Sequence, residues 1–272
     1  MPGDAELPEG VSKRLDHRLR VVARRDRAST TKLRRDVTVE SKVFEEVFDK
    51  PTLMTVYGLL RRRIICEIFG AVKAGKESKL YWAKTGDGTD VAVKIYLTGS
   101  AEFRKGMVKY IEGDPRFKSV KGGTRSLVSL WASKEFRNLK EAYAAGVHVP
   151  KPIFVENNVL VMEFVGRNGE PAPLLKDARL PKPERLYRKV LNDLRRLYWK
   201  ARLVHGDLSE YNVMVWRGKP IIFDLSQAVS VEHPQALTFL KRDTLNLTRY
   251  FEKAGVTVID VEQTYRWIKG EA

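Results

Sequence analysis

The sequence predicts an α+β protein of two lobes, a β-rich N-terminal lobe and an α-rich C-terminal lobe. Between residues 65 and 98, three short apolar runs follow one another with turn residues between them, as in an antiparallel sheet. After residue 184 the apolar residues recur mainly at helical spacing. A proline-rich connection at residues 170–184 separates the two patterns, so we expect a cleft between the lobes.

The composition is that of a folded chain with a strongly basic surface. Hydrophobic residues make up 43% of the 272 positions, which is enough to bury a core. The formal net charge of +16 attracts polyanions such as nucleic acid. A solvated surface rich in lysine and arginine, as in proteins adapted to heat, is the alternative. Charge alone does not decide between the two.

Nothing in the sequence points to secretion or to a membrane. Cys66 is the single cysteine and cannot form an internal disulfide. No apolar stretch reaches about 18 residues, and the first residues, MPGDAELPEG, lack the charged-then-apolar order of a signal peptide. We therefore expect a soluble cytoplasmic protein with no membrane partner. The sequence predicts no oligomeric state.

The N-terminal part is expected to be a basic arm followed by a helix. Residues 1–50 are predicted to form the arm, partly helical or disordered, because residues 11–36 are rich in Arg and Lys. A helix is expected to begin after Thr52 and to precede the N-terminal lobe, predicted at 51–165. Its apolar residues at helical spacing are Leu53, Tyr57, Leu60 and Ile64.

Three antiparallel strands are expected to open the N-terminal lobe. They are the apolar runs at residues 65–72, 78–84 and 90–97. The Gly-Asp-Gly stretch at 86–88 favours a hairpin turn between the second and the third strand.

One helix and two further strands complete this lobe. The amphipathic pattern at about 128–145 predicts a helix, ended by Gly146 and by the prolines at 150 and 152. Residues 153–166 contain two more strand patterns, joined at the asparagines 157 and 158.

The C-terminal lobe is predicted to span residues 166–272. A helix is expected at about 184–201, with two short strands around residues 203–215 and helices near 234–254 and 258–269. The apolar face of the first helix consists of Leu186, Val190, Leu194 and Leu197.

The stretch LVHGDLSEYNVMV at 203–215 carries the strongest chemical signal. Asn212 follows Asp207 with the spacing D-x-x-x-x-N, and Asp224 follows the apolar run PIIF. Phosphoryl-transfer enzymes use this arrangement to hold a nucleophile and Mg²⁺ at ATP. We expect Asp207 to be the catalytic base or the orienting group for a hydroxyl or water, and Asn212 and Asp224 to bind Mg²⁺ or Mn²⁺. Two carboxylates in loops by chance are the alternative.

Lys94 lies in the middle of the strand pattern DVAVKIYL. Period 2 places it on the same face as Ala92 and Tyr96. A buried lysine needs an anionic partner, and the α- and β-phosphates of a nucleotide would supply one. A lysine on an edge strand, facing water, is the alternative.

Glu135 is expected to supply a second partner for Lys94. It lies four residues after Trp131 and four before Leu139, so it shares their apolar face and should point inward. The alternative is that Glu135 is one of several exposed charges, together with Lys134 and Arg137.

The turn in GAVKAGKESKLY, between the first two strands, is a weaker signal. Its backbone amides and Lys76 could cover phosphates. It is neither a Walker A sequence nor the G-x-G-x-x-G of ordinary protein kinases, since only Gly75 remains at the tip.

Together, these motifs resemble the RIO family of atypical serine/threonine protein kinases, specifically its type-1 branch in an archaeal-like short form. The resemblance covers about residues 51–250. In the family's order it includes GKES, AVKIY, YIEGDPRF, WASKEFRNL, VLVMEFVG, VHGDLSEYN and FDLSQAV. The turn AGKESKLY differs from the GKEANVY more usual in type 1 and is closer to the type-2 pattern.

The resemblance implies a bilobal protein-kinase-like fold that binds ATP and Mg²⁺. No A-P-E signature follows Asp224, so the ordinary peptide-docking subdomain is expected to be missing. Asp224 is implied to be a transient phosphate acceptor, forming an aspartyl-phosphate, as well as a metal ligand. The implied nucleotide-contacting residues are Gly75, Lys76, Ser78, Lys94, Glu135, Met162 at the back of the pocket, and the hinge Glu163, Phe164 and Val165.

The resemblance also implies autophosphorylation in the basic, turn-rich stretch at 104–127. Ser119, Thr124 and Ser126 are the candidate acceptors. A plain surface loop without phosphorylation is the alternative.

The function that this resemblance implies is a Mg-ATP-dependent serine/threonine kinase and ATPase acting on the small ribosomal subunit precursor, with the basic surface contacting rRNA. A small-molecule phosphotransferase is one alternative, because H-G-D-x-x-x-x-N also marks aminoglycoside and choline kinases. Those enzymes bind cationic substrates, which a chain of charge +16 suits poorly. A non-catalytic, nucleotide-gated rRNA-binding assembly factor is the other, and the presence of Lys94, Asp207 and Asp224 argues against it.

Overall fold

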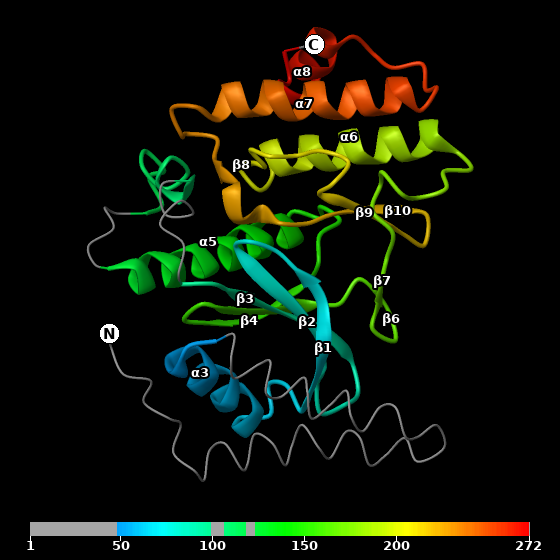
Figure 1. Ribbon diagram of the computed structural model, residues 1–272. Coiled ribbons are helices and arrows are strands. Elements are labelled where there is room, and N and C mark those ends of the chain that lie inside the picture. The colour runs from blue at the N-terminus through cyan, green and yellow to red at the C-terminus, as the bar shows by residue number, and fades with distance from the viewer. Residues whose placement is uncertain (1–47, 99–105, 118–122, 272) are drawn as a thin grey trace.

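The structure is a computed structural model that describes residues 48–98, 106–117 and 123–271 (Figure 1). A five-stranded antiparallel sheet dominates the N-terminal part and helices dominate the C-terminal part, which confirms the predicted fold class. The predicted basic arm lies outside the described residues up to position 47, and so does Ser119. The lobe boundaries assigned from the sequence stay a prediction. No helix in the described part of the chain is both long and apolar enough to cross a membrane.

The first described helix, α3 (Lys50–Arg61), begins earlier than expected. The Asp49 carboxylate accepts a hydrogen bond from the Thr52 backbone N–H at 3.0 Å and caps the helix, and Pro51 lies in the first turn. These capping residues, rather than the first apolar residue, therefore set its start.

The end of α3 excludes Ile64, which the apolar pattern includes. Arg63 adopts a left-handed conformation with φ 59°. The N–H groups of Arg63 and Ile64 then donate to the carbonyls of Leu60 and Leu59, at 3.2 and 3.0 Å. This double hydrogen bond is a Schellman motif, which closes the helix.

The sheet has the strand order β1-β2-β3-β5-β4, and all neighbours are antiparallel. The first strand starts two residues later than expected, because its pairing with the second strand begins at Glu67 and Lys84. The pairing continues to Ala74 with two register shifts. The strands are β1 (Glu67–Ala74), β2 (Ser78–Lys84), β3 (Asp90–Tyr96), β4 (Pro152–Glu156) and β5 (Val159–Glu163). β3 is therefore the central strand.

Both faces of β3 are buried, in the predicted alternation. Val91, Val93 and Ile95 belong to a core shared with α3. Ala92 and Tyr96 belong to the other core, shared with α5 (Thr124–Ala144). Figure 1 shows α3 and α5 on opposite sides of the sheet. A side chain at position 94 therefore points toward α5 and the C-terminal lobe.

The prediction that α5 begins near residue 128 was wrong. The helix starts at Thr124, directly after the extended backbone of Gly123, and it contains no Gly or Pro that would delay its start. Thr124 and Ser126 therefore lie in its first turn and not in a loop. The segment before it also differs from a plain surface loop, because Met107, Tyr110 and Ile111 are buried in the core.

In the described part of the C-terminal lobe, two long helices and one short helix lie together at the top of Figure 1. All four predicted apolar residues of the first are buried, and every predicted helix is found within a few residues of its expected ends. The elements are β6 (Gly166–Arg167), β7 (Glu170–Pro171), α6 (Pro183–Trp199), β8 (Leu203–Val204), β9 (Val213–Trp216), β10 (Lys219–Ile222), the 3-10 helix η1 (Leu225–Gln227), β11 (Val229–Ser230), α7 (Ala236–Lys253) and α8 (Val261–Lys269).

The connection between the sheet and the helical part needs a glycine at Gly166. Its φ is 157°, and a Cβ there would lie 2.1 Å from the carbonyl oxygen of Glu170. Without a side chain, the small hairpin β6-β7 can fold back immediately after β5.

α7 supports the segment after β8 through a buried carboxylate. The two oxygens of Asp243 accept hydrogen bonds from the backbone N–H groups of Gly206 and Leu208, at 2.8 and 2.9 Å. Burial raises the pKa of Asp243 to about 7, although these two donors act in the opposite direction. The backbone on both sides of Asp207 is thereby attached to α7.

The buried side chain of Asn158, which lies between β4 and β5, attaches α3 to the sheet. Its Nδ2 donates to Thr52 Oγ1 at 3.0 Å and to the Tyr96 carbonyl at 2.7 Å. Only 2% of Asn158 is exposed, so water cannot replace these bonds.

We expect Asn158→Ala to lower the free energy of unfolding by about 1–3 kcal/mol, because it leaves buried polar groups without their partner. Urea denaturation would measure this. Asn192→Ala is the matched control, since Asn192 is exposed on α6, and its effect should stay within about 0.5 kcal/mol. Equal effects of both changes would contradict the role given to Asn158.

We expect the stability difference between wild type and Asp243→Asn to depend on pH. An aspartate whose pKa rises from 3.8 to about 7 on folding favours the folded state at low pH and loses this contribution as the pH rises toward 7. Wild type should therefore lose stability relative to the variant between about pH 5 and about pH 7, the upper part of this window, at no more than about 1.4 kcal/mol per pH unit. A difference that is constant across this range would show that Asp243 is ionised throughout.

Candidate active site

Lys94 lies between two carboxylates from distant parts of the chain. Its Nζ is 3.0 Å from Glu135 Oε1 and 2.9 Å from Asp224 Oδ1. Lys94 is 8% exposed and Glu135 is fully buried. The expected contact between these two is present, and the alternatives of an edge-strand lysine and an exposed glutamate are wrong. Burial lowers the pKa of Lys94, but Asp224 and Glu135 outweigh it and hold that pKa well above its ordinary value.

Tyr96 is a further partner of Glu135 that the sequence-based assignment did not include. The Tyr96 hydroxyl donates to Glu135 Oε2. Tyr96 follows Lys94 by two positions on β3, so the two side chains share a face and reach the same carboxylate. Glu135 is therefore held by both.

Asp224 follows β10 in a left-handed backbone conformation, with φ 60°. Its Oδ1 accepts from Lys94 Nζ and from Ser226 Oγ, each at 2.9 Å. Burial raises the pKa of Asp224, but these two donors outweigh it and lower the pKa to about 2. The side chain keeps 42% of its surface exposed, so a ligand can reach the ionised carboxylate.

Asp207 and Asn212 face each other across a tight loop. Asn212 Nδ2 donates to the Asp207 carbonyl at 2.7 Å and lies 3.5 Å from Asp207 Oδ2. Because a carbonyl can only accept, the amide nitrogen must face it, and the amide oxygen is left as the group that can bind a cation. Burial, with a contribution from Asp224, raises the pKa of Asp207.

His205 connects the segments that carry the two aspartates. Its ring is fully buried. Nε2 lies 3.1 Å from the Phe223 carbonyl, and Nδ1 accepts from the Asp207 N–H at 3.3 Å. A neutral ring with its proton on Nε2 satisfies both contacts, and burial lowers the pKa of His205 accordingly. His205 thus acts on the backbone next to each aspartate.

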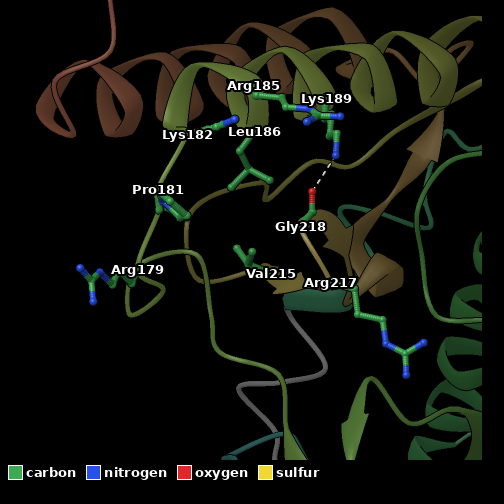
Figure 2. Close-up of a pocket in the computed structure, with 10 residues that line it drawn as sticks. Arg179, Pro181, Lys182, Arg185, Leu186, Lys189, Val215, Arg217 and Gly218 are labelled. Atoms are coloured by element: carbon green, nitrogen blue, oxygen red, sulfur yellow. Dashed lines mark hydrogen bonds between the residues drawn. The ribbon is translucent and has the colours of Figure 1, made fainter.

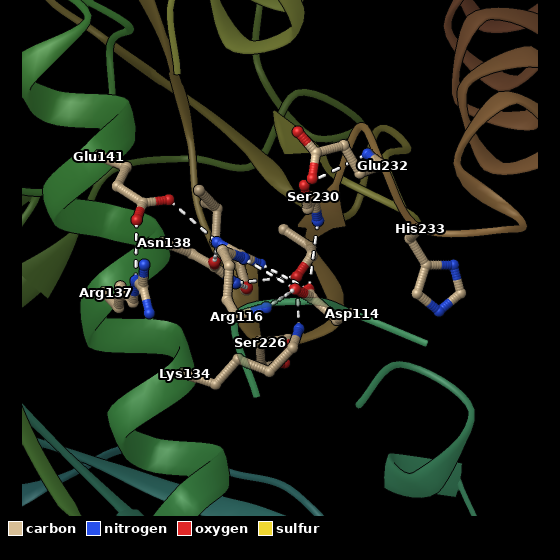
Figure 3. A network of polar contacts seen from close by, with 12 residues as sticks. Asp114, Arg116, Lys134, Arg137, Asn138, Glu141, Ser226, Ser230, Glu232 and His233 are labelled. Carbon is tan, nitrogen blue, oxygen red and sulfur yellow. Dashed lines mark hydrogen bonds and ion pairs between the residues drawn. The ribbon is translucent and has the colours of Figure 1, made fainter. Parts of the chain in front are cut away.

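α5 holds the segment that follows β10, as Figure 3 shows. Lys134 is fully buried, and its Nζ donates to the carbonyl of Ser226 at 2.9 Å and to that of Ala228. Asn138 Nδ2 donates to the carbonyls of Leu225 and Ala228 at 2.8 and 2.9 Å. These four hydrogen bonds attach η1 to α5.

Arg116 extends this network toward the segment before α5 (Figure 3). Its guanidinium is 2.7 Å from Asp114 Oδ2, 2.8 Å from Asn138 Oδ1 and 2.9 Å from Glu141 Oε2. Burial and the neighbouring charge of Arg116 lower the pKa of Lys134 to about 7.

The turn between β1 and β2 lies over the aspartates. The Gly75 N–H donates to the Ser78 carbonyl at 2.9 Å and closes the turn, while Lys76 is exposed at its tip. Burial raises the pKa of Glu77, and the charges of Asp224 and Asp207 raise it further. The charge of Glu77, which had no assigned role, is therefore coupled to the charges of these two aspartates.

The expected hinge residues lie where the chain leaves the sheet. Met162 is 8% exposed and pairs with Ala92 of β3. Glu163 ends β5, and the Val165 carbonyl accepts from the Ala172 N–H at 2.9 Å. Residues 163–165 form the connection that leads from β5 to the helical part of the chain. Their contact with a nucleotide stays a prediction.

The sequence analysis did not identify the buried polar side chains that hydrogen-bond to the backbone. Asp243 lies four residues before Leu247 and three after Leu240, so a carboxylate on an apolar helix face was the available signal. Lys134 was considered only as one of several exposed charges, and that alternative was wrong, since it is fully buried.

Comparisons with known proteins agree with this geometry. Residues 79–264 match the family model described as RIO domain. The chain is 41% identical over 253 residues to the RIO-type serine/threonine-protein kinase Rio1 of Haloferax volcanii, covering 93% of this chain and 86% of that protein. It is 40% identical over 230 residues to the Methanocaldococcus jannaschii Rio1, covering 85% and 78%. Against human serine/threonine-protein kinase RIO1 it is 41% identical over 228 residues, covering 82% of this chain and 40% of the human protein.

Solved structures show the same fold. The Rio2 kinase-ADP/Mg²⁺-phosphoaspartate complex from Chaetomium thermophilum has a TM-score of 0.64 at 20% identity and covers 98% of this chain and 89% of that one. A second structure of that kinase has a TM-score of 0.65 at 21% identity, with coverage of 96% and 86%. With the family match and the Rio1 relatives, this identifies the chain as a member of the RIO-type serine/threonine-protein kinases, as its motifs indicate.

Proposed function

We propose that the centre around Lys94, Asp207 and Asp224 transfers the γ-phosphoryl group of ATP in a Mg²⁺-dependent reaction. The observation that supports this best is the pair of contacts from Lys94 Nζ, at 3.0 Å to Glu135 and 2.9 Å to Asp224. They join the central strand of the sheet to the segment after β10, so that both lobes contribute to one charged centre.

The donor set suits Mg²⁺. In the part of the chain that the structure describes, no cluster of three or more His, Cys, Asp or Glu side chains could hold a metal ion. A cation here would therefore depend on Asp224 and the amide oxygen of Asn212, with phosphate and water oxygens completing its shell, as Mg²⁺ prefers. When bound, Mg²⁺ would neutralise charge on the phosphates and help to hold them in line with the attacking group.

Lys94 would bind the α- and β-phosphates of ATP. Glu135 and Tyr96 keep its ammonium in place, so phosphate oxygens would replace Asp224 as its second partner. Gly75, Lys76 and Ser78 of the β1-β2 turn would cover the phosphates, and Met162 with the hinge Glu163–Val165 would contact the adenine.

Asp207 would accept the proton of the attacking hydroxyl or water. Its raised pKa makes it a better base than an aspartate of ordinary pKa, because partial desolvation and the charge of Asp224 both oppose its ionisation.

Asp224 would also accept the phosphoryl group for part of the cycle. One of its oxygens bonds to the γ-phosphorus as the bond to the β-γ bridging oxygen breaks, which leaves ADP and an acyl phosphate; water then hydrolyses the acyl phosphate. The exposed part of its carboxylate supports this, and the Rio2 structure of similar fold is described as a phosphoaspartate complex.

The proposed setting is the maturation of the small ribosomal subunit, with rRNA as a binding partner and a cytoplasmic location. The net charge of +16 supports a polyanionic partner. Autophosphorylation is proposed as well. Of the described candidates, Ser126 is exposed in the first turn of α5, and Thr124 beside it is half-buried.

The test is single-turnover hydrolysis of γ-labelled ATP with Mg²⁺, with and without purified small ribosomal subunits. We expect Asp207→Asn to lower the rate by a factor on the order of 10²–10⁴, because it removes the base. Label should be trapped on wild-type protein and be absent from Asp224→Asn. Asp177→Asn, a change at an exposed aspartate, is the matched control and should keep the wild-type rate.

Hydrolysis that continues at the wild-type rate in Asp207→Asn would contradict the catalytic proposal. Binding of ATP and rRNA without hydrolysis in any variant would favour a nucleotide-gated assembly factor instead.

We expect Lys134→Met to make ATP hydrolysis need a higher Mg²⁺ concentration, although Lys134 is not one of the proposed nucleotide-binding residues. Losing the amino group leaves the Ser226 carbonyl without this donor and the Ala228 carbonyl with Asn138 as its remaining side-chain donor, which loosens the segment next to Asp224. We expect the Mg²⁺ concentration for half-maximal hydrolysis to rise by on the order of tenfold, as for residues that orient a metal ligand. Lys140→Met, an exposed change on the same helix, is the control. An unchanged Mg²⁺ dependence in Lys134→Met would exclude this positioning role.

A further inference from the structure

A pocket outside the proposed active site lies between the start of α6 and the turn joining β9 to β10 (Figure 2). Its volume is about 310 Å³, which is at the lower end of the range for small-ligand sites. It shares no residue with the centre around Lys94, so the phosphoryl-transfer chemistry leaves it unexplained.

The rim of this pocket is positive. Its lining contains five cationic side chains and no carboxylate. Four of the five are exposed, and none forms an ion pair within residues 48–98, 106–117 and 123–271. The five are Arg179, Lys182, Arg185, Lys189 and Arg217.

Other cations on the helices of this lobe do have ion-pair partners. Arg196, further along α6, pairs with Asp193 at 3.1 Å, and Lys241 on α7 pairs with Glu262 at 3.0 Å. Unpaired cations around a hollow repel one another, and an anion bound between them relieves this repulsion.

Contacts at the β9-β10 hairpin define the positions of two of these cations, Lys189 and Arg217. Lys189 Nζ donates to the Gly218 carbonyl at 2.6 Å and ties the hairpin to α6, and Arg185 lies one turn earlier on the same helix beside it (Figure 2). Arg217 and Gly218 have φ of 51° and 69°, the signature of a type I′ turn. This turn places Arg217 at the hairpin tip, with its guanidinium 5.4 Å from the Trp216 ring centre.

The floor of the pocket is apolar, and the start of α6 adds to the positive potential. Leu180, Pro181, Leu186 and Val215 provide the apolar lining. Lys182 precedes the helix without a side-chain cap, so the amide groups after Pro183 remain available to an anion, while Glu184 in the same turn offsets part of their positive potential. A fitting ligand therefore carries negative charge next to a flat, weakly polar group.

We propose that this pocket binds single-stranded RNA, with the cationic rim contacting successive backbone phosphates and one nucleotide resting on the apolar floor. The inference rests on the proposed function, in that rRNA is the expected partner. Arginine guanidinium groups match phosphate oxygens well, and bases exposed in single strands are available to an apolar surface. RNA suits this rim better than a singly phosphorylated peptide, because the cations extend from Arg179 to Arg217 and repeated phosphates can meet them.

The test is the affinity for a short fluorescein-labelled oligouridine, measured by fluorescence anisotropy without nucleotide at several salt concentrations. The pocket variant is Arg185→Gln with Arg217→Asn. Gln is a good helix former at position 185, and Asn tolerates the left-handed conformation at position 217. The control is Lys140→Gln with Arg249→Gln, which removes the same charge from exposed positions on α5 and α7.

We expect the pocket variant to raise the Kd on the order of tenfold and to reduce the slope of log Kd against log salt by about 1.4, which is about 0.7 for each of two lost phosphate contacts. The control should change the Kd less than about threefold, as diffuse attraction predicts. Both variants should keep the thermal midpoint and the ATP hydrolysis of wild type.

Equal losses in both double variants would overturn the proposal, because the attraction would then follow net charge alone. An unchanged Kd in the pocket variant would do the same. A peptide with one phosphoserine serves as the competing probe, and pocket-dependent binding of this peptide but not of oligouridine would assign the site to another ligand class. The RNA-binding measurement contains no ATP, so its result does not depend on whether the protein hydrolyses ATP. The RNA-binding proposal and the catalytic proposal can therefore fail independently.

Discussion

The structure depends on one buried positive charge, the ammonium of Lys94, and on the carboxylates that compensate it. A lysine on a central strand is tolerated only with anionic partners, and Glu135 and Asp224 meet this need at 3.0 and 2.9 Å. Because one partner comes from α5 and the other from the segment after β10, the same electrostatic requirement that places Lys94 also draws the two parts of the chain together. The phosphates of a nucleotide would compete with Asp224 for this charge.

The groups around this centre act mainly on backbone atoms. His205 contacts the backbone beside both aspartates, Asp243 holds the loop around Asp207, and Lys134 holds the carbonyls after Asp224. Each of these side chains is buried, so its hydrogen bonds have no competition from water. The carboxylates of Asp207 and Asp224 are thereby oriented through their own main chain, and part of the Asp224 side chain stays exposed to a ligand.

The two anion sites proposed for this protein differ in the burial of their cations and in the partners of those cations. At the candidate active site the lysine is buried and already neutralised, so an incoming phosphate exchanges one anionic partner for another. At the pocket beside α6 the cations are mostly exposed and form no ion pair with any residue that the structure describes, so binding adds a partner and should weaken steeply with salt. The first arrangement suits selective, reversible binding of a nucleotide, and the second suits attachment to a long polyanion.

Local patterns by themselves determined the succession of strands and helices along the chain and the D-x-x-x-x-N loop. Periods of 2 and 3.6 residues also favoured an inward direction for Lys94 and Glu135 but left an exposed position open for each. Two helix starts differ from the apolar pattern: the Asp49 side chain caps α3, and α5 begins directly after the extended backbone of Gly123. Only the tertiary structure decided that Lys94 meets Asp224, which lies 130 positions away, and that Lys134 binds a carbonyl 92 positions away. Every residue has a backbone carbonyl, so a side chain that donates to a distant carbonyl requires no particular residue type and no particular spacing. No sequence pattern therefore records such a contact.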